Sequence, residues 1–191
     1  EKTVLLHTCC APCSSAIIEA LMQNGITPVI YYCNPNIYPQ EEYEIRKNEC
    51  TRYAQSLGLE IVDADYDHEN WLDAVKGLEG EPERGGRCLK CFKLRLLRTA
   101  QYASERGIKV ITTTLASSRW KSLDQINEAG HWACRQLTAR RSSAAPHDEV
   151  IWWDQNWRKG GLQERRLQII KEYDFYNQLY CGCEFSIRKE D

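Results

Sequence analysis

Seven of the ten cysteines in this chain stand in three short motifs that lie far apart in the sequence. The motifs are found near the start, the middle and the end of the chain: Cys9-Cys10-Ala11-Pro12-Cys13, Cys88-Leu89-Lys90-Cys91 and Cys181-Gly182-Cys183. A fold that brings the three motifs together holds seven thiols in one place. Four thiolates saturate a tetrahedral zinc ion or a cubane iron–sulfur cluster, which leaves three for a second metal site or a redox thiol. This surplus favours a metalloenzyme over a domain that zinc only stabilises.

The spacing within each motif indicates how its sulfurs are used. Two cysteines three positions apart, as in the middle motif, can bind one zinc ion or one cluster, or can form a redox pair. The first motif begins a predicted helix, whose N-terminus lowers the pKa of a thiol and so favours metal binding. Gly182 permits a sharp turn that directs both neighbouring sulfurs inward. We therefore predict seven metal-ligating residues: Cys9, Cys10, Cys13, Cys88, Cys91, Cys181 and Cys183. Three further cysteines stand alone and are expected to be core or surface thiols: Cys33, Cys50 and Cys134.

Length and composition predict a single catalytic domain over residues 1–191, with the C-terminal segment 175–191 closing over the metal site. The mean hydropathy of −0.58 and the lack of a long apolar run argue against a transmembrane helix. The first residues predict a strand rather than a signal peptide. Without a secretion signal, many cysteines indicate metal or redox chemistry rather than disulfides. We therefore expect a cytoplasmic protein with no membrane partner.

The net charge of −2 hides a difference between the two halves of the chain. Residues 1–91 contain 8 Lys and Arg against 15 Asp and Glu, whereas residues 92–191 contain 17 against 12. Within 135–171 there are 8 basic and 4 acidic residues, including the pairs Arg140-Arg141, Arg158-Lys159 and Arg165-Arg166. Such side chains either cover solvated helix faces or contact the phosphates of a nucleic acid, and charge alone leaves both possibilities open.

Strand and helix patterns alternate along the chain, which predicts an α/β fold with an open parallel sheet of about four to five strands flanked by helices. The expected strands are 3–7, 27–33, 60–63, 110–114 and 150–153. The expected helices are 14–24, capped by Ser14 or Ser15, then 40–57, 69–76, 91–106, 122–137 and 162–173. The stretch 135–146 is the best candidate for an exposed insertion.

Functional residues of such a sheet gather beyond the carboxyl ends of its strands. The first cysteine motif stands where nucleotide-binding folds place their phosphate loop, but it contains no glycine, so it does not predict a phosphate site. Asp154 follows the last predicted strand, where a functional role and a helix cap or salt bridge are equally good explanations. His7 either supports the metal ligands or is a packed core residue. Six aromatic residues are expected to form either core or a stacking surface for a base: Tyr31, Tyr32, Trp120, Trp152, Trp153 and Trp157.

The motifs together resemble those of one protein family, the cobalamin-independent epoxyqueuosine reductases known as QueH. The resemblance covers nearly the whole chain, and its segments occur in this order: His7-Thr8-Cys9-Cys10-Ala11-Pro12-Cys13, Asn34-Pro35-Asn36-Ile37, Glu41-Glu42-Tyr43, Tyr66-Asp67, Trp71, Val75-Lys76-Gly77, Glu81-Pro82-Glu83, Arg87-Cys88, Cys91, Thr112-Thr113-Thr114-Leu115 and Tyr180-Cys181-Gly182-Cys183. The sheet would then resemble the ATP-pyrophosphatase-like (HUP) fold without its phosphate loop.

This resemblance implies a reaction, its cofactors and its partners. The family reduces the epoxide of epoxyqueuosine, at the wobble position of tRNA, to the cyclopentene of queuosine. It holds a [4Fe-4S] cluster beside a single iron ion and takes electrons from an external donor that the sequence does not identify. Six of the motif cysteines match metal-binding positions of the family, and Cys13 stands where the family has Asp or Cys. The residues expected to be catalytic are Cys13 and Asp154. Those expected to bind the substrate are Asn34, Asn36, Thr113 and Arg158.

Three alternatives remain open at this point. An iron–sulfur enzyme that thiolates tRNA would share the architecture, although it would need a Ser- or Gly-rich phosphate loop after the first strand. A zinc-bound RNA-binding module would use four cysteines and leave three idle. A plain dithiol reductase would stay active after metal removal. A coloured protein with iron and acid-labile sulfide would separate the reductase from the zinc module.

Overall fold

The computed structural model of the protein describes residues 2–140 and 149–187. Residues 141–146 of the predicted insertion, and residues 188–191 of the predicted closing segment, lie outside the described residues. The strands are β1 (Lys2–Thr8), β2 (Ile26–Tyr32), β3 (Ile61–Asp63), β4 (Val110–Thr113) and β5 (Ile151–Trp152). The helices are α1 (Ala11–Gln23), α2 (Gln40–Ser56), α3 (His68–Val75), α4 (Gly86–Glu105), α5 (Leu123–Arg140) and α6 (Leu162–Tyr173), with short 3₁₀ helices η1 (Thr114–Ser117) and η3 (Glu184–Ser186).

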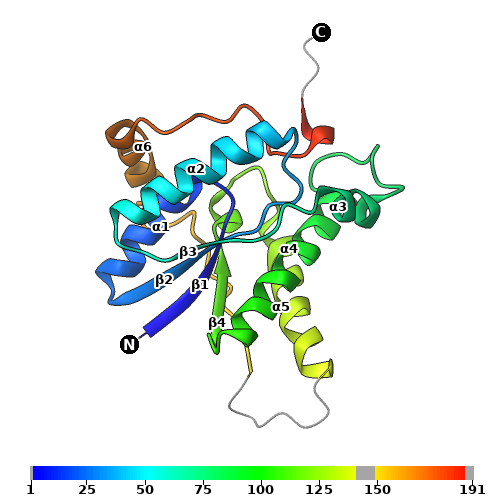
Figure 1. The fold of residues 1–191 in the computed structure, drawn as a ribbon, viewed down its shortest axis with the longest axis horizontal. Coiled ribbons are helices and arrows are strands. Elements are labelled where there is room, and N and C mark those ends of the chain that lie inside the picture. The colour runs from blue at the N-terminus through cyan, green and yellow to red at the C-terminus, as the bar shows by residue number, and fades with distance from the viewer. Residues whose placement is uncertain (1, 141–148, 188–191) are drawn as a thin grey trace.

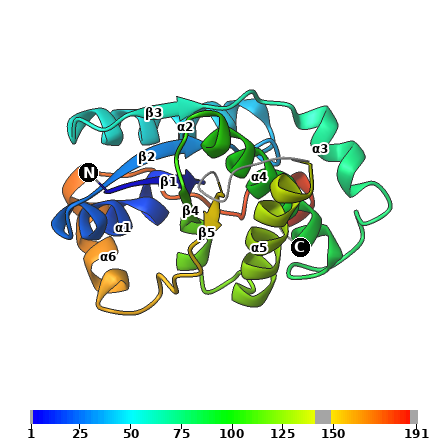
Figure 2. The ribbon, with the colours of Figure 1, turned by 90° about the horizontal axis from the view of Figure 1, so that it is seen from below.

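The five strands form one sheet in the order β3-β2-β1-β4-β5, and all neighbouring strands are parallel. The predicted α/β class with an open parallel sheet is therefore confirmed. Helices α1, α2 and α6 lie on one side of the strands, and α4 and α5 lie on the other (Figure 1). Figure 2 shows the same layers from below, with α6 against α1 and α5 beside α4. Because helices cover both faces, the last five residues of β1 are buried without alternation.

Most predicted elements are found within a few residues of their expected bounds, and helix 162–173 is confirmed at both ends. The predicted cap of α1 is wrong. The helix begins at Ala11 with Cys10 as N-cap and Pro12 in its first turn, a position where proline is favoured. The hydroxyl of Ser14 instead donates to the carbonyls of Cys10 and Ala11 inside the helix. Helix α4 begins five residues earlier than expected, so Cys88 lies within it.

One glycine permits the close contact between α5 and β5. A Cβ atom at Gly130 would lie only 2.1–2.5 Å from atoms of the Trp152 indole. The indole therefore packs directly on the backbone of α5, and its Nε1 donates to Asn127 at 3.1 Å.

The chain returns to the carboxyl side of the sheet after α6. Residues 174–187, here called the C-terminal strap, run across α2 and end in η3 near α3 and α4 (Figure 1). The hydroxyl of Tyr176 and the carbonyl of Tyr180 are bonded to side chains of α2. The strap thereby brings the third cysteine motif to the side of the sheet where β1, β2 and β4 end. Among the described residues, no helix combines the length and apolar character needed to span a membrane.

Candidate metal centre

The first cysteine motif forms a compact group at the carboxyl end of β1. The sulfur atoms of Cys9, Cys10 and Cys13 all lie within 4.8 Å of one another. Hydrogen bonds from the thiols of Cys10 and Cys13 lower the pKa of Cys9, whereas burial raises the pKa of Cys10. Three neighbouring thiols cannot all ionise without a cation between them, and a thiophilic metal ion is such a cation. This group therefore suggests a metal site.

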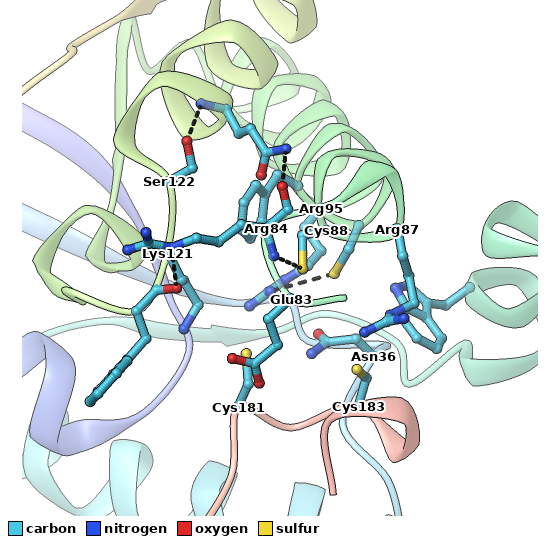
Figure 3. Close-up of a pocket in the computed structure, with 15 residues that line it drawn as sticks. Asn36, Glu83, Arg84, Arg87, Cys88, Arg95, Lys121, Ser122, Cys181 and Cys183 are labelled. Atoms are coloured by element: carbon cyan, nitrogen blue, oxygen red, sulfur yellow. Dashed lines mark hydrogen bonds between the residues drawn. The ribbon is translucent and has the colours of Figure 1, made fainter. Parts of the chain in front are cut away.

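The other four motif cysteines line a single cavity between α4 and the C-terminal strap (Figure 3). Cys88 and Cys91 lie in the first turns of α4, and their spacing places both on one face of the helix. Cys181 and Cys183 reach the cavity from the strap. Between them, Gly182 has a φ of +143°, and a Cβ there would lie 3.2–3.3 Å from three neighbouring side chains. The turn therefore requires glycine, as predicted, and of its two neighbours Cys183 is buried whereas Cys181 is exposed.

A buried ion pair on α2 anchors this part of the strap. Arg46 donates to the carbonyls of Cys181 and Tyr180 at 3.0 and 3.2 Å, and to the carboxylate of Glu42 at 2.8 Å. The second carboxylate oxygen of Glu42 accepts the hydroxyl of Tyr176 at 2.9 Å. Because both Arg46 and Glu42 are buried, this network fixes the backbone that presents the last two thiols.

Several polar atoms around the cavity lined by these four thiols are buried and have no hydrogen-bond partner among the described residues. They are Asn36 Oδ1, Trp71 Nε1, Arg87 Nε and Gln125 Oε1. An unpaired buried polar group costs about 1–3 kcal/mol. Two of these atoms are N–H donors. Trp71 Nε1 lies against the Cys91 thiol and Arg87 Nε has no partner, and the sulfurs of a bound metal group accept hydrogen bonds. These donors and the four thiols therefore fit a metal group in this cavity.

Two cations lie where they would offset the negative charge of the cysteines once these ionise to thiolates. Arg95 is buried and donates to Cys91 Sγ at 3.8 Å, to the carbonyl of Cys33 at 3.2 Å and to Asn34 Oδ1. Burial opposes the charge on Lys121, but the negative charge of Cys181 and of the first motif outweighs burial and raises the pKa of Lys121. Both cations therefore stay charged beside the thiols, as a site rich in thiolate requires.

A second cavity, of about 310 Å³, adjoins the first. Cys9 and Cys13 of the first motif line it, together with Arg166 of α6 and Leu179 of the strap. Four residues line both cavities: Glu83, Trp120, Lys121 and Cys181. The structure thus brings the three motifs together as two neighbouring groups of thiols, four around one cavity and three beside the other. The volume of the second cavity lies at the lower end of the range for small-molecule sites.

The residues predicted to bind the substrate have different surroundings. Asn36 lines the first cavity. Asn34 is buried, accepts from Arg95 and donates to the carbonyl of Thr8 at 2.9 Å, so its amide holds other residues in place. Thr113 is also buried, and its oxygen lies 2.7 Å from His7 Nδ1.

His7 orders the carboxyl ends of three strands. Its Nε2 lies 2.9 Å from the carbonyl of Cys33, which can only accept, so Nε2 bears the proton. Burial, with the charge of Arg95, lowers the pKa of His7 to about 3. The ring is therefore neutral, and its Nδ1 accepts the hydroxyl hydrogen of Thr113. Of the two explanations that the sequence allowed, this geometry matches the packed core residue.

Asp154 and Arg158 are not among the residues that line the two cavities. Asp154 follows β5, has a side chain that is 63% exposed and lies 3.8 Å from His131 Nε2. Arg158 donates to the carbonyl of Lys121 at 2.7 Å and so holds the loop between η1 and α5. Their predicted roles remain predictions, and the geometry gives Arg158 a structural contact.

Sequence reasoning missed three charged residues of the site. Arg95 lies four positions after Cys91, so one helical turn places it against that thiol, and this spacing could have identified it. Glu83 stands five positions before Cys88, but its place at the cavities depends on the loop between α3 and α4. Lys121 follows an irregular turn, and no local pattern in the sequence indicates that it faces thiols from other segments.

Comparison with known proteins gives consistent matches over the whole chain. The sequence profile of a family described as "Epoxyqueuosine reductase QueH" matches residues 4–189. A protein of that name from Histophilus somni is 50% identical over 188 residues, which cover 98% of this chain and 73% of the relative. The protein of the same name from Haemophilus influenzae is 49% identical over 188 residues, which also cover 98% of this chain and 73% of the relative. One from Acinetobacter baylyi is 45% identical over 185 residues, 97% of this chain and 80% of the relative.

Proposed function

Since the chain belongs to the QueH family of epoxyqueuosine reductases, we propose that it reduces the epoxide of epoxyqueuosine at the tRNA wobble position to the cyclopentene of queuosine. The reaction breaks both carbon–oxygen bonds of the epoxide and forms a carbon–carbon double bond. It takes up two electrons and two protons and releases the oxygen as water. The electrons come from an external donor whose identity is open. A tRNA substrate is consistent with a cytoplasmic enzyme.

The arrangement of the seven thiols as two adjoining groups is the observation that carries this proposal. Cys88, Cys91, Cys181 and Cys183 match the donor set of a [4Fe-4S] cluster. The three thiols of the first motif would hold a single iron ion. When bound, these groups supply electrons one at a time and a Lewis acid for the epoxide oxygen. The C-terminal strap closes over both groups.

The protein's own residues position the substrate and supply a proton. Lys121 and Arg166 line the second cavity and offer positive charge to the phosphates of the RNA. Among the described residues, Glu83 is the one carboxyl group in the lining of either cavity, and it extends toward Cys181 (Figure 3). We assign it, ahead of the more distant Asp154 and the Cys13 thiol, as the donor of a proton to the leaving oxygen.

Metal and sulfide analysis of the anaerobically purified protein tests this proposal. We expect about four sulfides and about five irons per chain, with visible absorption near ~400 nm. Cys88→Ala should lose sulfide and colour. Cys13→Ala should keep about four sulfides but lose about one iron together with reduction of epoxyqueuosine tRNA. Cys134→Ala, a thiol outside both groups, is the matched control and should change neither quantity.

Two results would contradict the proposal. Zinc without sulfide would indicate the RNA-binding module instead. Full colour in Cys88→Ala would refute the division of the thiols into these two groups.

A further inference from the structure

The two most exposed large apolar side chains of the described residues lie at one cavity. Leu179 is 85% exposed and Trp120 is 76% exposed, and both line the second cavity. They come from different parts of the chain, the C-terminal strap and the loop between η1 and α5. Because both line one cavity that also carries cations and thiols, this cavity mouth is a candidate binding site.

The loop that presents Trp120 is held in place by its backbone. Arg84 donates to the carbonyls of Arg119 and Trp120 at 2.5 and 2.9 Å, and Arg158 donates to the next carbonyl, that of Lys121, at 2.7 Å. Three successive carbonyls are thus bonded to arginines from two other segments. The indole is therefore exposed on an ordered loop, which lowers the entropy lost when a ligand binds.

The strap holds Leu179 in a similar way. Its neighbour Gln178 donates to Cys10 Sγ at 2.7 Å, and its neighbour Tyr180 accepts from Arg46 at 3.2 Å. Both flanking residues are bonded to other parts of the protein, while the leucine side chain itself is exposed at the second cavity.

The charges and thiols of the same cavity indicate what these two side chains hold. Lys121 and Arg166 favour an anionic ligand, and the partly buried Cys9 and Cys13 lie deeper than the exposed Trp120 and Leu179. Proteins recognise single-stranded RNA by stacking unpaired bases on aromatic side chains beside cations that contact phosphate. A modified nucleotide fits this arrangement if its reactive ring faces the deeper thiols and its base lies at the mouth of the cavity, beside Trp120 and Leu179.

We propose that Trp120 and Leu179 form a clamp that holds the base of the modified nucleotide, unstacked from its RNA loop, at the mouth of the cavity. This inference rests on the proposed function, since it takes the modified RNA as the ligand. Trp120 provides the stacking face, and Leu179 closes the other side of the base. The clamp fixes the distance between the base and the thiols of the first motif.

A double-mutant cycle between protein and RNA tests the clamp. The probes are an anticodon stem-loop with epoxyqueuosine at the wobble position and the same stem-loop with an abasic wobble nucleotide. We expect Trp120→Ala to raise the Kd for the modified stem-loop at least about fivefold, the lower end for loss of a base stack. Trp120→Phe, which keeps an aromatic face, should stay within about twofold. For the abasic stem-loop, Trp120→Ala and the unaltered protein should bind equally.

The second residue of the clamp is tested with Leu179→Ala, which should weaken binding of the modified stem-loop. Leu167→Ala is the matched control, because Leu167 is an exposed leucine of α6 that lines neither of the two cavities. An equal loss with both RNAs, or no loss in Trp120→Ala, would overturn the clamp. Failure of the unaltered protein to reduce the modified RNA would overturn the proposed function instead, and the binding cycle would still decide on the clamp.

Discussion

Glu83 and Asp154 are the two carboxyl groups considered as proton donors, and they differ in what surrounds them. Glu83 lines both cavities together with Lys121 and Cys181. Both side chains are exposed, but Asp154 lies beside His131 at the end of β5 and lines neither cavity. A general acid must reach the leaving oxygen directly or through one water molecule. Of the two, only Glu83 lies where its carboxyl group could reach the oxygen of an epoxide bound close to the thiols.

We predict that Glu83→Gln lowers the rate of epoxide reduction by about 100-fold or more, the range for loss of a general acid. Glutamine keeps the size of the side chain but cannot donate an acidic proton. The measurement is a single-turnover assay under anaerobic conditions with excess reductant, so that electron supply does not limit the rate. Glu69→Gln, an exposed residue of α3, is the control. Loss of rate in Asp154→Asn, with a normal rate in Glu83→Gln, would reverse the assignment.

At the scale of elements, helix α2 determines where the strap lies. Its buried Arg46–Glu42 pair is bonded to two strap carbonyls and one strap hydroxyl. The cysteine motif of the strap is therefore placed by residues more than 130 positions away in the chain. Removing one partner of such a buried ion pair strongly destabilises the fold, because the remaining charge stays buried without its partner.

We predict that Arg46→Gln lowers the free energy of unfolding by about 3–5 kcal/mol, since it leaves Glu42 without its cation. Amide hydrogen exchange in the strap should become faster in the same variant, measured by mass spectrometry on peptides that cover 174–187. Lys47→Gln is the matched control, because Lys47 lies on the same helix and its ion pairs with Glu44 and Asp63 involve no strap residue. It should change stability by less than about 1 kcal/mol. Unchanged exchange in Arg46→Gln would show that the strap is held by other contacts.

At the scale of the whole molecule, the sequence predicts the fold class and the thiol set better than it predicts the arrangement of the site. The alternation of strands and helices follows from local patterns, and helix 162–173 could be predicted to the residue. The division of the thiols could not, because it depends on the strap crossing α2 and on Gly182 packing closely beside three side chains. Both the path of the strap and the packing around Gly182 are tertiary contacts, which local sequence patterns do not indicate.

The aromatic residues show the same limit. Six were candidates for either core or a stacking surface, and burial separates them only in the folded chain. Tyr31, Tyr32, Trp152 and Trp157 are buried, whereas Trp120 is highly exposed. The residues on either side of Trp120, Arg119 and Lys121, are polar, and this local pattern does not tell whether the indole is buried or exposed. The distinction arises because the strands and helices that cover the other rings leave the loop after η1 uncovered.

The basic pairs of the second half have different roles in the folded chain. The sequence left open whether the basic residues of segment 135–171 cover solvated helix faces or contact RNA phosphates, and its arginines differ in whether their charge is already neutralised. Arg165 is bonded to the carboxylates of Glu19 and Glu172 at 2.6–2.8 Å. Arg166, the next residue, donates to the carbonyl of Pro12 and lines the second cavity. A carbonyl is neutral, so the charge of Arg166 stays available to a phosphate.

We therefore predict that Arg166→Gln changes the salt dependence of RNA binding, whereas Arg165→Gln does not. Each phosphate contact releases counterions, so the slope of log Kd against log salt should fall by about 0.7 to 0.9 in Arg166→Gln. The measurement is the Kd of the anticodon stem-loop between about 50 and 200 mM salt. Arg165→Gln removes the same charge one residue away and so controls for net charge. An equal fall of the slope in both variants would mean that the RNA responds to overall charge, and that Arg166 makes no phosphate contact of its own.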